Sequence, residues 1–199
     1  MDIRIPLATS NGYAERNKSR FEAELIPLSK TEDFPDVYAQ FLKRHPKADH
    51  YPYAYCIAPL SKSSDDGEPG GSGGRPLLSL LSDLGVDKAV LIVARYFGGT
   101  KLGAGNLRRC FVEAGKSAID AGRFGTSKTV YDYVFECDYA QYDALSKWAK
   151  AKGKKILSPI FGETVRATLR SDDKISLEGI LPGDFVLPEP DPKTIIAED

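Results

Sequence analysis

The sequence predicts an α+β protein with two domains. Segments in which apolar and polar residues alternate, as in half-buried strands, are interspersed with segments in which apolar residues recur every three or four positions, as in helices. Gly122 and Gly125 interrupt this pattern, and a separate strand–helix–strand–strand order follows from residue 128. We therefore expect a first domain over residues 1–126 and a smaller α+β domain over residues 127–199.

In the first domain, strands and helices are expected to alternate. Phe21, Ala23 and Leu25 alternate with charged residues, as in a strand with one buried face. A helix is expected to start near Pro76, because proline is tolerated in the first turn, and Asn106 is a candidate N-cap for the last helix. The expected elements are strands at residues 19–28, 53–58 and 88–96, and helices at about 33–44, 76–84 and 106–121.

The second domain is expected to begin with a strand over residues 129–138 and a helix over 140–152, which Gly153 ends. Residues 155–160 and 164–169 are typical of a hairpin. No second helix is predicted after Leu169, so the domain is expected to be truncated. From about Pro188 the chain is rich in proline and acidic residues, which indicates an extended or mobile tail.

The composition is that of a soluble globular protein, with 42% hydrophobic and 28% charged residues and a net charge of −1. No apolar run approaches the roughly 20 residues that span a bilayer, and the N-terminus lacks a signal-peptide core. We therefore expect a cytoplasmic protein without a membrane partner. Cys56, Cys110 and Cys137 are far apart in the sequence, which indicates reduced thiols and neither a disulfide framework nor a zinc site.

Positive charge is concentrated in two stretches. Residues 88–128 contain eight basic and two acidic residues, a local excess of six positive charges, and five lysines between residues 147 and 155 surround Trp148. Such clusters attract polyanions even when the net charge is near zero, although a solvated helix face has the same composition.

The segment from Lys88 to Gly105 combines an apolar strand, Arg95, and a loop with four glycines around Lys101. Glycines let a ligand approach the main chain, so this loop is a candidate anion site. It is no nucleotide fingerprint, because Leu102 follows Lys101 where a phosphate-binding loop needs a hydroxyl. The candidate anion-binding or nucleic-acid-binding residues are Arg95, Tyr96, Gly98, Gly99, Lys101, Arg108 and Arg109.

A catalytic alternative rests on the carboxylates and imidazoles near the other glycine-rich loop, at residues 61–75. The carboxylate–imidazole set that could hold a metal ion or supply a general acid and base is His45, Asp49, His50, Asp65, Asp66 and Glu68. In the catalytic alternative, His50, Asp66 and Glu68 would act on a small phosphorylated or anionic substrate. The same residues also suit turns, helix caps and hydrogen-bonded strand ends. We predict no resident cofactor or metal ion, and regard a non-enzymatic role as the leading hypothesis.

Two motifs in series identify a family resemblance. DDGEPGGSGGRP at residues 65–76 and VARYFGGTKLGAGNLRR at residues 93–109 resemble the signature of the IMPACT (YigZ) family. KSRF at residues 18–21 and the segment from His50 to Tyr55 are similar to its upstream pattern, so the resemblance covers about residues 11–125. Ser72, Asn106 and Cys110 depart from the residues usual in the family.

The resemblance implies a fold and a cellular context. The first domain would be the two-layer α/β fold of ribosomal protein S5 domain 2, and the second a ferredoxin-like domain similar to the last domain of elongation factor G. Eukaryotic relatives modulate the kinase that restrains translation initiation, whereas this chain resembles the bacterial branch.

Three functional hypotheses follow. The first is a non-catalytic protein that contacts RNA, the ribosome or a translation factor and modulates translation or a stress response. Tyr96 or Phe97 would stack on bases, and the phosphates would be contacted by Arg95, Lys101, Arg108 and Arg109. The second is the enzyme described above. In the third, the motifs specify turns of the fold and Arg95 forms an internal ion pair.

Overall fold

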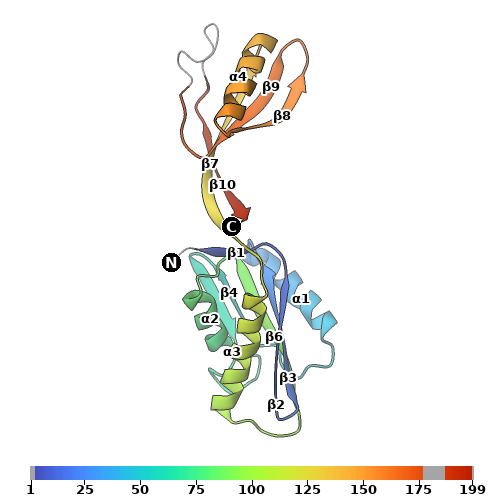
Figure 1. Cartoon of the computed structure of the whole chain (residues 1–199). Coiled ribbons are helices and arrows are strands. Elements are labelled where there is room, and N and C mark those ends of the chain that lie inside the picture. The colour runs from blue at the N-terminus through green and yellow to red at the C-terminus, as the bar shows by residue number, and fades with distance from the viewer. Residues whose placement is uncertain (1–2, 177–186, 199) are drawn as a thin grey trace. The chain divides into compact units, whose positions relative to one another are not determined.

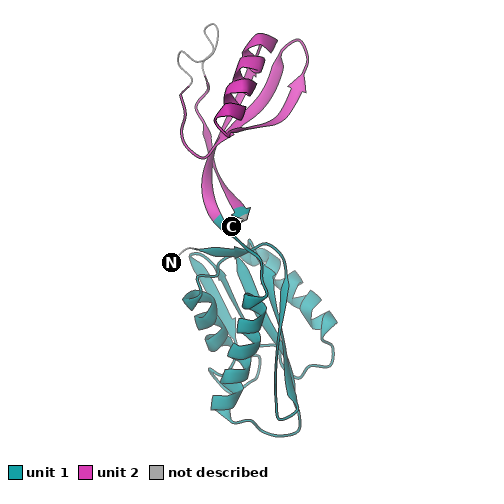
Figure 2. Ribbon diagram, viewed as in Figure 1, with its two compact units in different colours: residues 1–126, 197–199 teal, residues 127–196 magenta. Residues whose placement is uncertain are grey.

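The computed structural model describes residues 3–176 and 187–198. The chain divides into two compact units, one of residues 1–126 with 197–199 and the other of residues 127–196 (Figure 2). Each unit has its own hydrophobic core. The mixed α+β class expected from the sequence is confirmed.

The first unit contains a five-stranded antiparallel sheet (Figure 1). Its strands, in spatial order, are β2 (Ser10–Arg16), β3 (Ser19–Pro27), β6 (Ala89–Tyr96), β4 (Tyr53–Ile57) and β5 (Leu60–Ser64). The expected strands form as β3, β4 and β6, and the two edge strands were not predicted. In the central strand β6, every residue from Ala89 to Arg95 is buried.

Helices cover both faces of this sheet. The three are α1 (Phe34–Arg44), preceded by a 3₁₀ turn at Thr31–Asp33, α2 (Gly74–Asp83) and α3 (Ala104–Asp120). Leu91 and Val93 of β6 belong to the same core cluster as residues of α2 and α3, whereas Val90 and Ile92 belong to the cluster that includes Phe41 of α1. Since successive strand residues point to opposite faces, β6 is apolar on both. Helix α1 therefore adds a layer that the two-layer expectation did not include.

The second unit is built on β7 (Phe124–Cys137), the strand that leads out of the first unit, where its first residues pair with β1 (Arg4–Pro6). It continues with α4 (Tyr139–Ala151), β8 (Lys155–Phe161) and β9 (Val165–Ser171), as predicted. Asp138 and Gln141 form a capping box at the start of α4, because each side chain accepts a hydrogen bond from the other's backbone N–H. Helix α4 packs Leu145 and Ala149 against β7 and β9.

The tail from Pro188 was expected to be extended or mobile, and its last residues are extended. Asp191–Glu198 form strand β10, which pairs with β7. Pro192 removes one backbone donor, which a strand tolerates at the edge of a sheet. No second helix was predicted after Leu169, and none is present between Ser171 and Ser176. Residues 177–186 of the same region lie outside the described residues.

The cysteines described by the structure are all free thiols. Cys110 and Cys137 are buried and Cys56 is half-buried, and burial raises the pKa of each thiol. None of them lies at the groove described next.

Candidate binding groove

The two glycine-rich motifs meet at one groove of about 480 Å³ in the first unit. One wall comes from the loop after β5 and the other from the end of β6 and the loop into α3. This volume lies within the range of about 300–1,000 Å³ typical of small-molecule sites. The lining residues are Asp49, His50, Gly67, Glu68, Pro69, Arg95, Phe97, Lys101, Leu102, Gly103, Ala104 and Leu107.

The first loop is organised by Asp65. Its carboxylate accepts hydrogen bonds from the backbone N–H groups of Gly71 (2.7 Å), Gly73 (2.9 Å) and Gly74 (2.8 Å). Burial raises the pKa of the Asp65 carboxyl, but the three N–H donors together outweigh it, and the pKa lies below its usual value. Asp65 is therefore a structural anion that folds the loop back onto the start of α2.

The second loop approaches the chain between β2 and β3. A Cβ atom on Gly98 would lie 2.2 Å from the carbonyl carbon of Lys18, so only glycine fits there. The loop ends at Gly103, whose φ of 76° disfavours other residues, and α3 begins at Ala104. Asn106 is thus not the N-cap. It lies in the first turn, where its side chain donates to the carbonyl of Leu102 and accepts from Arg16.

An ion pair joins the first loop to the end of β6, and both of its residues line the groove. Arg95 Nη1 lies 2.6 Å from each of the two carboxylate oxygens of Glu68. The Glu68 side chain is 1% exposed and that of Arg95 10%, so both charges are largely removed from water. The third hypothesis is supported to this extent: Arg95 forms an internal ion pair. It nevertheless also lines the groove.

The other residues of the catalytic alternative also have structural partners. The Asp66 carboxylate accepts from the backbone N–H of Tyr51 at 2.7 Å. The Nδ1 atom of His50 lies 2.8 Å from the carbonyl oxygen of Asp66. His50 and Glu68 line the groove, whereas Asp66 does not. Among the described residues, no group of three or more His, Cys, Asp and Glu side chains is arranged to hold a metal ion.

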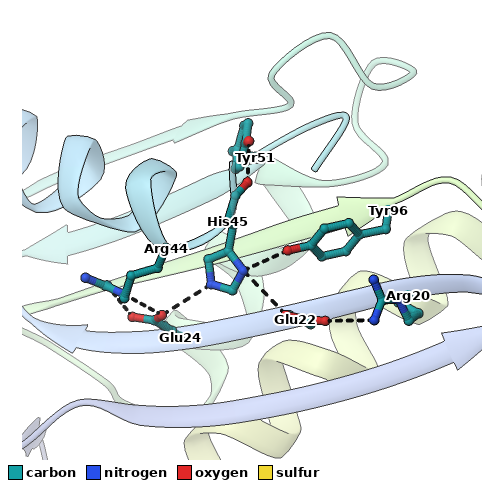
Figure 3. Close-up of polar contacts among 7 residues, drawn as sticks. All are labelled: Arg20, Glu22, Glu24, Arg44, His45, Tyr51 and Tyr96. Atoms are coloured by element: carbon teal, nitrogen blue, oxygen red, sulfur yellow. Dashed lines mark hydrogen bonds and ion pairs between the residues drawn. The ribbon is translucent and has the colours of Figure 1, made fainter. Parts of the chain in front are cut away.

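Tyr96 lies on the opposite face of the sheet from the groove. Its hydroxyl is 3.0 Å from His45 Nδ1, and the guanidinium of Arg20 lies over its ring (Figure 3). His45 also approaches Glu22 and Glu24, each at 3.4 Å. Burial, followed by the charge of Glu22, raises the pKa of the Tyr96 phenol. Tyr96 thus belongs to the contact between α1 and the sheet.

The remaining predicted residues are distributed around the groove. Lys101 is exposed and lines it. Arg108 and Arg109 are exposed on α3, where they line a separate hollow together with Gly105, Val112, Glu113 and Lys116. Gly98 and Gly99 shape the loop without lining the groove.

Asp49, which the sequence placed in the carboxylate–imidazole set, lines the groove. Sequence reasoning assigned no binding role to Leu102 or Leu107, which also line it. The two leucines carry no signal of their own, since an apolar residue near a helix start is usually part of the core.

The comparison with known proteins places the chain in a family. The model of the Impact N-terminal domain matches residues 17–119, a stretch that contains both motifs. The chain belongs to the IMPACT family. It is 36% identical over 156 residues to an IMPACT family member of Thermus thermophilus, with 77% of this chain and 84% of that protein covered. It is 30% identical over 142 residues to the IMPACT family member YigZ of Escherichia coli, with coverage of 69% and 70%.

The similarity extends to the three-dimensional structure. A solved structure of a hypothetical protein superposes with a TM-score of 0.60 at 27% identity and covers 85% of each chain. The family resemblance inferred from the two motifs is thereby confirmed. Within the described part of the chain, no helix has the length and apolar character needed to cross a membrane.

Proposed function

We propose that this IMPACT family member is a non-catalytic binding protein that contacts RNA of the translation machinery. Its contact surface consists of Lys101, Arg108 and Arg109, which we call the α3 cationic surface. The observation that carries the proposal is that all three side chains are exposed and that none forms an ion pair with any described residue.

A polyanion binds most favourably to surface cations that have no carboxylate partner within the protein. A cation that already has a carboxylate partner gains little from a phosphate, whereas an unpaired one releases counterions from the nucleic acid when it binds. Arg95, the first residue suggested by the sequence, is compensated by Glu68 and is a weaker candidate for phosphate contact. The expected contact therefore moves from the end of β6 to the start of α3.

An aromatic side chain accompanies these charges. Phe97 is 47% exposed and lines the groove beside Lys101. An exposed ring next to cations is the arrangement with which proteins stack single-stranded bases while holding the backbone. The family resemblance, which implies a partner associated with translation, supports RNA as the polyanion.

The enzymatic alternative has less support. Glu68 is committed to Arg95, Asp66 to the backbone of Tyr51, and His50 to the carbonyl of Asp66. Groups with such structural partners are poorly placed to transfer protons, and no observation favours them as an acid–base pair.

The test measures RNA affinity against salt concentration. We expect the full chain to bind a single-stranded RNA and purified ribosomes at low salt. The triple variant Lys101→Gln/Arg108→Gln/Arg109→Gln should bind at least tenfold more weakly. Its salt slope should be smaller by about 0.7 for each phosphate that the protein no longer neutralises.

The matched control is the triple variant Lys30→Gln/Lys43→Gln/Lys47→Gln, which removes the same charge around α1, on the other face of the sheet. It should retain the affinity of the wild type. Absence of RNA and ribosome binding at low salt, or equal weakening by both triple variants, would refute the proposal.

A further inference from the structure

Arg95 keeps one side of its guanidinium free. Glu68 binds only Nη1, while Nε is buried and has no hydrogen-bond partner. Nη2 forms no hydrogen bond with a described residue and is not among the buried unpaired atoms, so we infer that it reaches the groove that Arg95 lines. Arg44 and Arg170 hold their carboxylates through this same pair, Nε and Nη2.

An unpartnered donor on a side chain that is only 10% exposed points to a missing acceptor. The planar fork of Nε and Nη2 matches the two oxygens of a carboxylate. In this chain the internal carboxylate lies at the other side of the guanidinium and Nε is buried, so Nη2 is the nitrogen left for an external group.

The N-terminus of α3 lies at the same groove. Gly103 and Ala104 line it, and no side chain caps the helix. The backbone N–H groups of Ala104, Gly105 and Asn106 have no partner among the described residues. Free N–H groups and the helix dipole favour a negative group at this position, and Lys101 adds a full positive charge.

The groove also offers acceptors for a positive group. One carboxylate oxygen of Asp49 accepts from the backbone N–H of Phe97, and the other has no partner among the described residues. Because His50 Nδ1 faces a carbonyl oxygen, it carries the ring proton, and Nε2 of the neutral ring is an acceptor. Both residues line the groove.

The charges at the groove are balanced. Arg95 and Lys101 are matched by Asp49 and Glu68, so a dianion such as a phosphate monoester would meet as many negative as positive side chains. A ligand with one negative and one positive group meets no such repulsion. Between the charged residues, Phe97, Leu102 and Leu107 provide an apolar wall.

We propose that this groove binds a free α-amino acid with an apolar side chain. The carboxylate contacts Arg95 Nη2, Lys101 and the first N–H groups of α3. The ammonium group contacts Asp49 and His50 Nε2, and the side chain packs on the apolar wall. The proposal does not depend on RNA binding, although Lys101 serves both sites.

The first experiment titrates the full chain with small molecules and follows backbone amide shifts by NMR. L-leucine should shift the amides of residues 95–107 and bind more tightly than its derivatives. L-leucinamide, which lacks the carboxylate, should bind at least tenfold more weakly, and so should N-acetyl-L-leucine, which lacks the ammonium.

Each alternative has its own outcome. If N-acetyl-L-leucine binds as tightly as L-leucine, the groove takes a polypeptide C-terminus and the zwitterion proposal is wrong. If inorganic phosphate shifts these amides and L-leucine does not, the site is a phosphate site and the proposal is also wrong. Absence of any amide shift with L-leucine at millimolar concentrations would equally overturn it.

Two variants test the contacts of the ligand's carboxylate without touching the buried ion pair. Lys101→Gln removes a charge, and Ala104→Pro removes one N–H donor at the first helical position, where proline is tolerated. Each should weaken L-leucine binding at least fivefold, whereas Lys43→Gln on α1 should not change it.

Asp49→Asn should weaken binding of L-leucine but not the residual binding of N-acetyl-L-leucine. Unchanged L-leucine affinity in both Lys101→Gln and Ala104→Pro contradicts the proposal, even if the RNA experiment succeeds.

Discussion

Both carboxylate oxygens of Glu68 lie 2.6 Å from one nitrogen of Arg95, Nη1. This contact joins the loop after β5 to the end of β6, two segments that the sequence separates by 27 residues. Because the pair is largely buried, each residue neutralises a charge that would otherwise be costly to remove from water. The two motifs are thus joined physically as well as by their order in the chain.

Breaking this pair should destabilise the first unit strongly. Arg95→Ala leaves the buried Glu68 without a partner, and we expect the free energy of unfolding to fall by about 3–5 kcal/mol. Glu68→Ala should have a similar effect for the same reason. The measurement is urea unfolding followed by far-UV circular dichroism and by NMR signals of the first unit.

The double variant Arg95→Ala/Glu68→Ala provides the decisive comparison. Since it removes both charges, it should cost less than the two single variants together. The exposed pair of Lys116 and Asp120 is the control, and Lys116→Ala should change stability by less than about 1 kcal/mol. Additive effects at Arg95 and Glu68 would show that the pair contributes no coupling.

Three glycines of the second loop and the helix that follows it should respond differently to alanine. In Gly98→Ala, the new Cβ would lie 2.2 Å from one backbone atom and 2.3 Å from the next, and we expect a loss of more than about 2 kcal/mol. Gly99 has open space but a φ of 87°, so strain of about 1–2 kcal/mol is expected. Gly105 lies in α3 with no atom within 4 Å, and alanine there should stabilise by about 0.4–1 kcal/mol. Thermal unfolding of the three variants gives this order or refutes it.

Asp65 should make stability depend on pH. Its folded-state pKa lies below the unfolded value of about 3.9, so its contribution is complete above that value and is lost as the pH falls through the folded-state pKa. Asp65→Asn should cost about 1.5–3 kcal/mol at pH 7, because three hydrogen bonds to a charged group are weakened. Urea unfolding from pH 7 to pH 2 should show the difference between variant and wild type shrinking from about pH 4 downward. A difference that stays constant over this range would contradict the role assigned to Asp65.

The elements predicted correctly are those whose burial follows a regular period. Strand β3 buries Phe21, Ala23 and Leu25 on one face, and β6 is apolar and buried from Ala89 to Ala94. Strands β1, β2, β5 and β10 were missed, and they carry little apolar signal. β5 has no buried residue, and β2 approaches α3 so closely that a Cβ on Gly12 would lie 2.2 Å from the carbonyl oxygen of Ala114. Such strands are specified by their neighbours in the sheet and not by their own pattern.

The site was predicted in part. The glycine spacing identified both loops, but the partner of Arg95 depends on how β4 and β6 align, which no local pattern encodes. The absence of Tyr96 from the groove was predictable. Neighbouring residues of a strand point to opposite faces, so Arg95 and Tyr96 could not both line one groove. The unpartnered nitrogens of Arg95 follow from side-chain geometry, which a sequence does not contain.

Tyr96 and Phe97 should therefore separate structural from binding effects. Tyr96→Phe removes the hydroxyl that meets His45, and we expect a loss of about 0.5–1.5 kcal/mol in stability with unchanged affinity for RNA and L-leucine. Phe97→Ala removes an exposed ring from the groove, so RNA affinity should fall by about 1–3 kcal/mol per stacked base while stability changes little. The measurements are urea unfolding and fluorescence anisotropy with a labelled RNA. Loss of RNA affinity in Tyr96→Phe at unchanged stability would mean that the RNA contact lies on the α1 side of the sheet, because that hydroxyl faces His45 and not the groove.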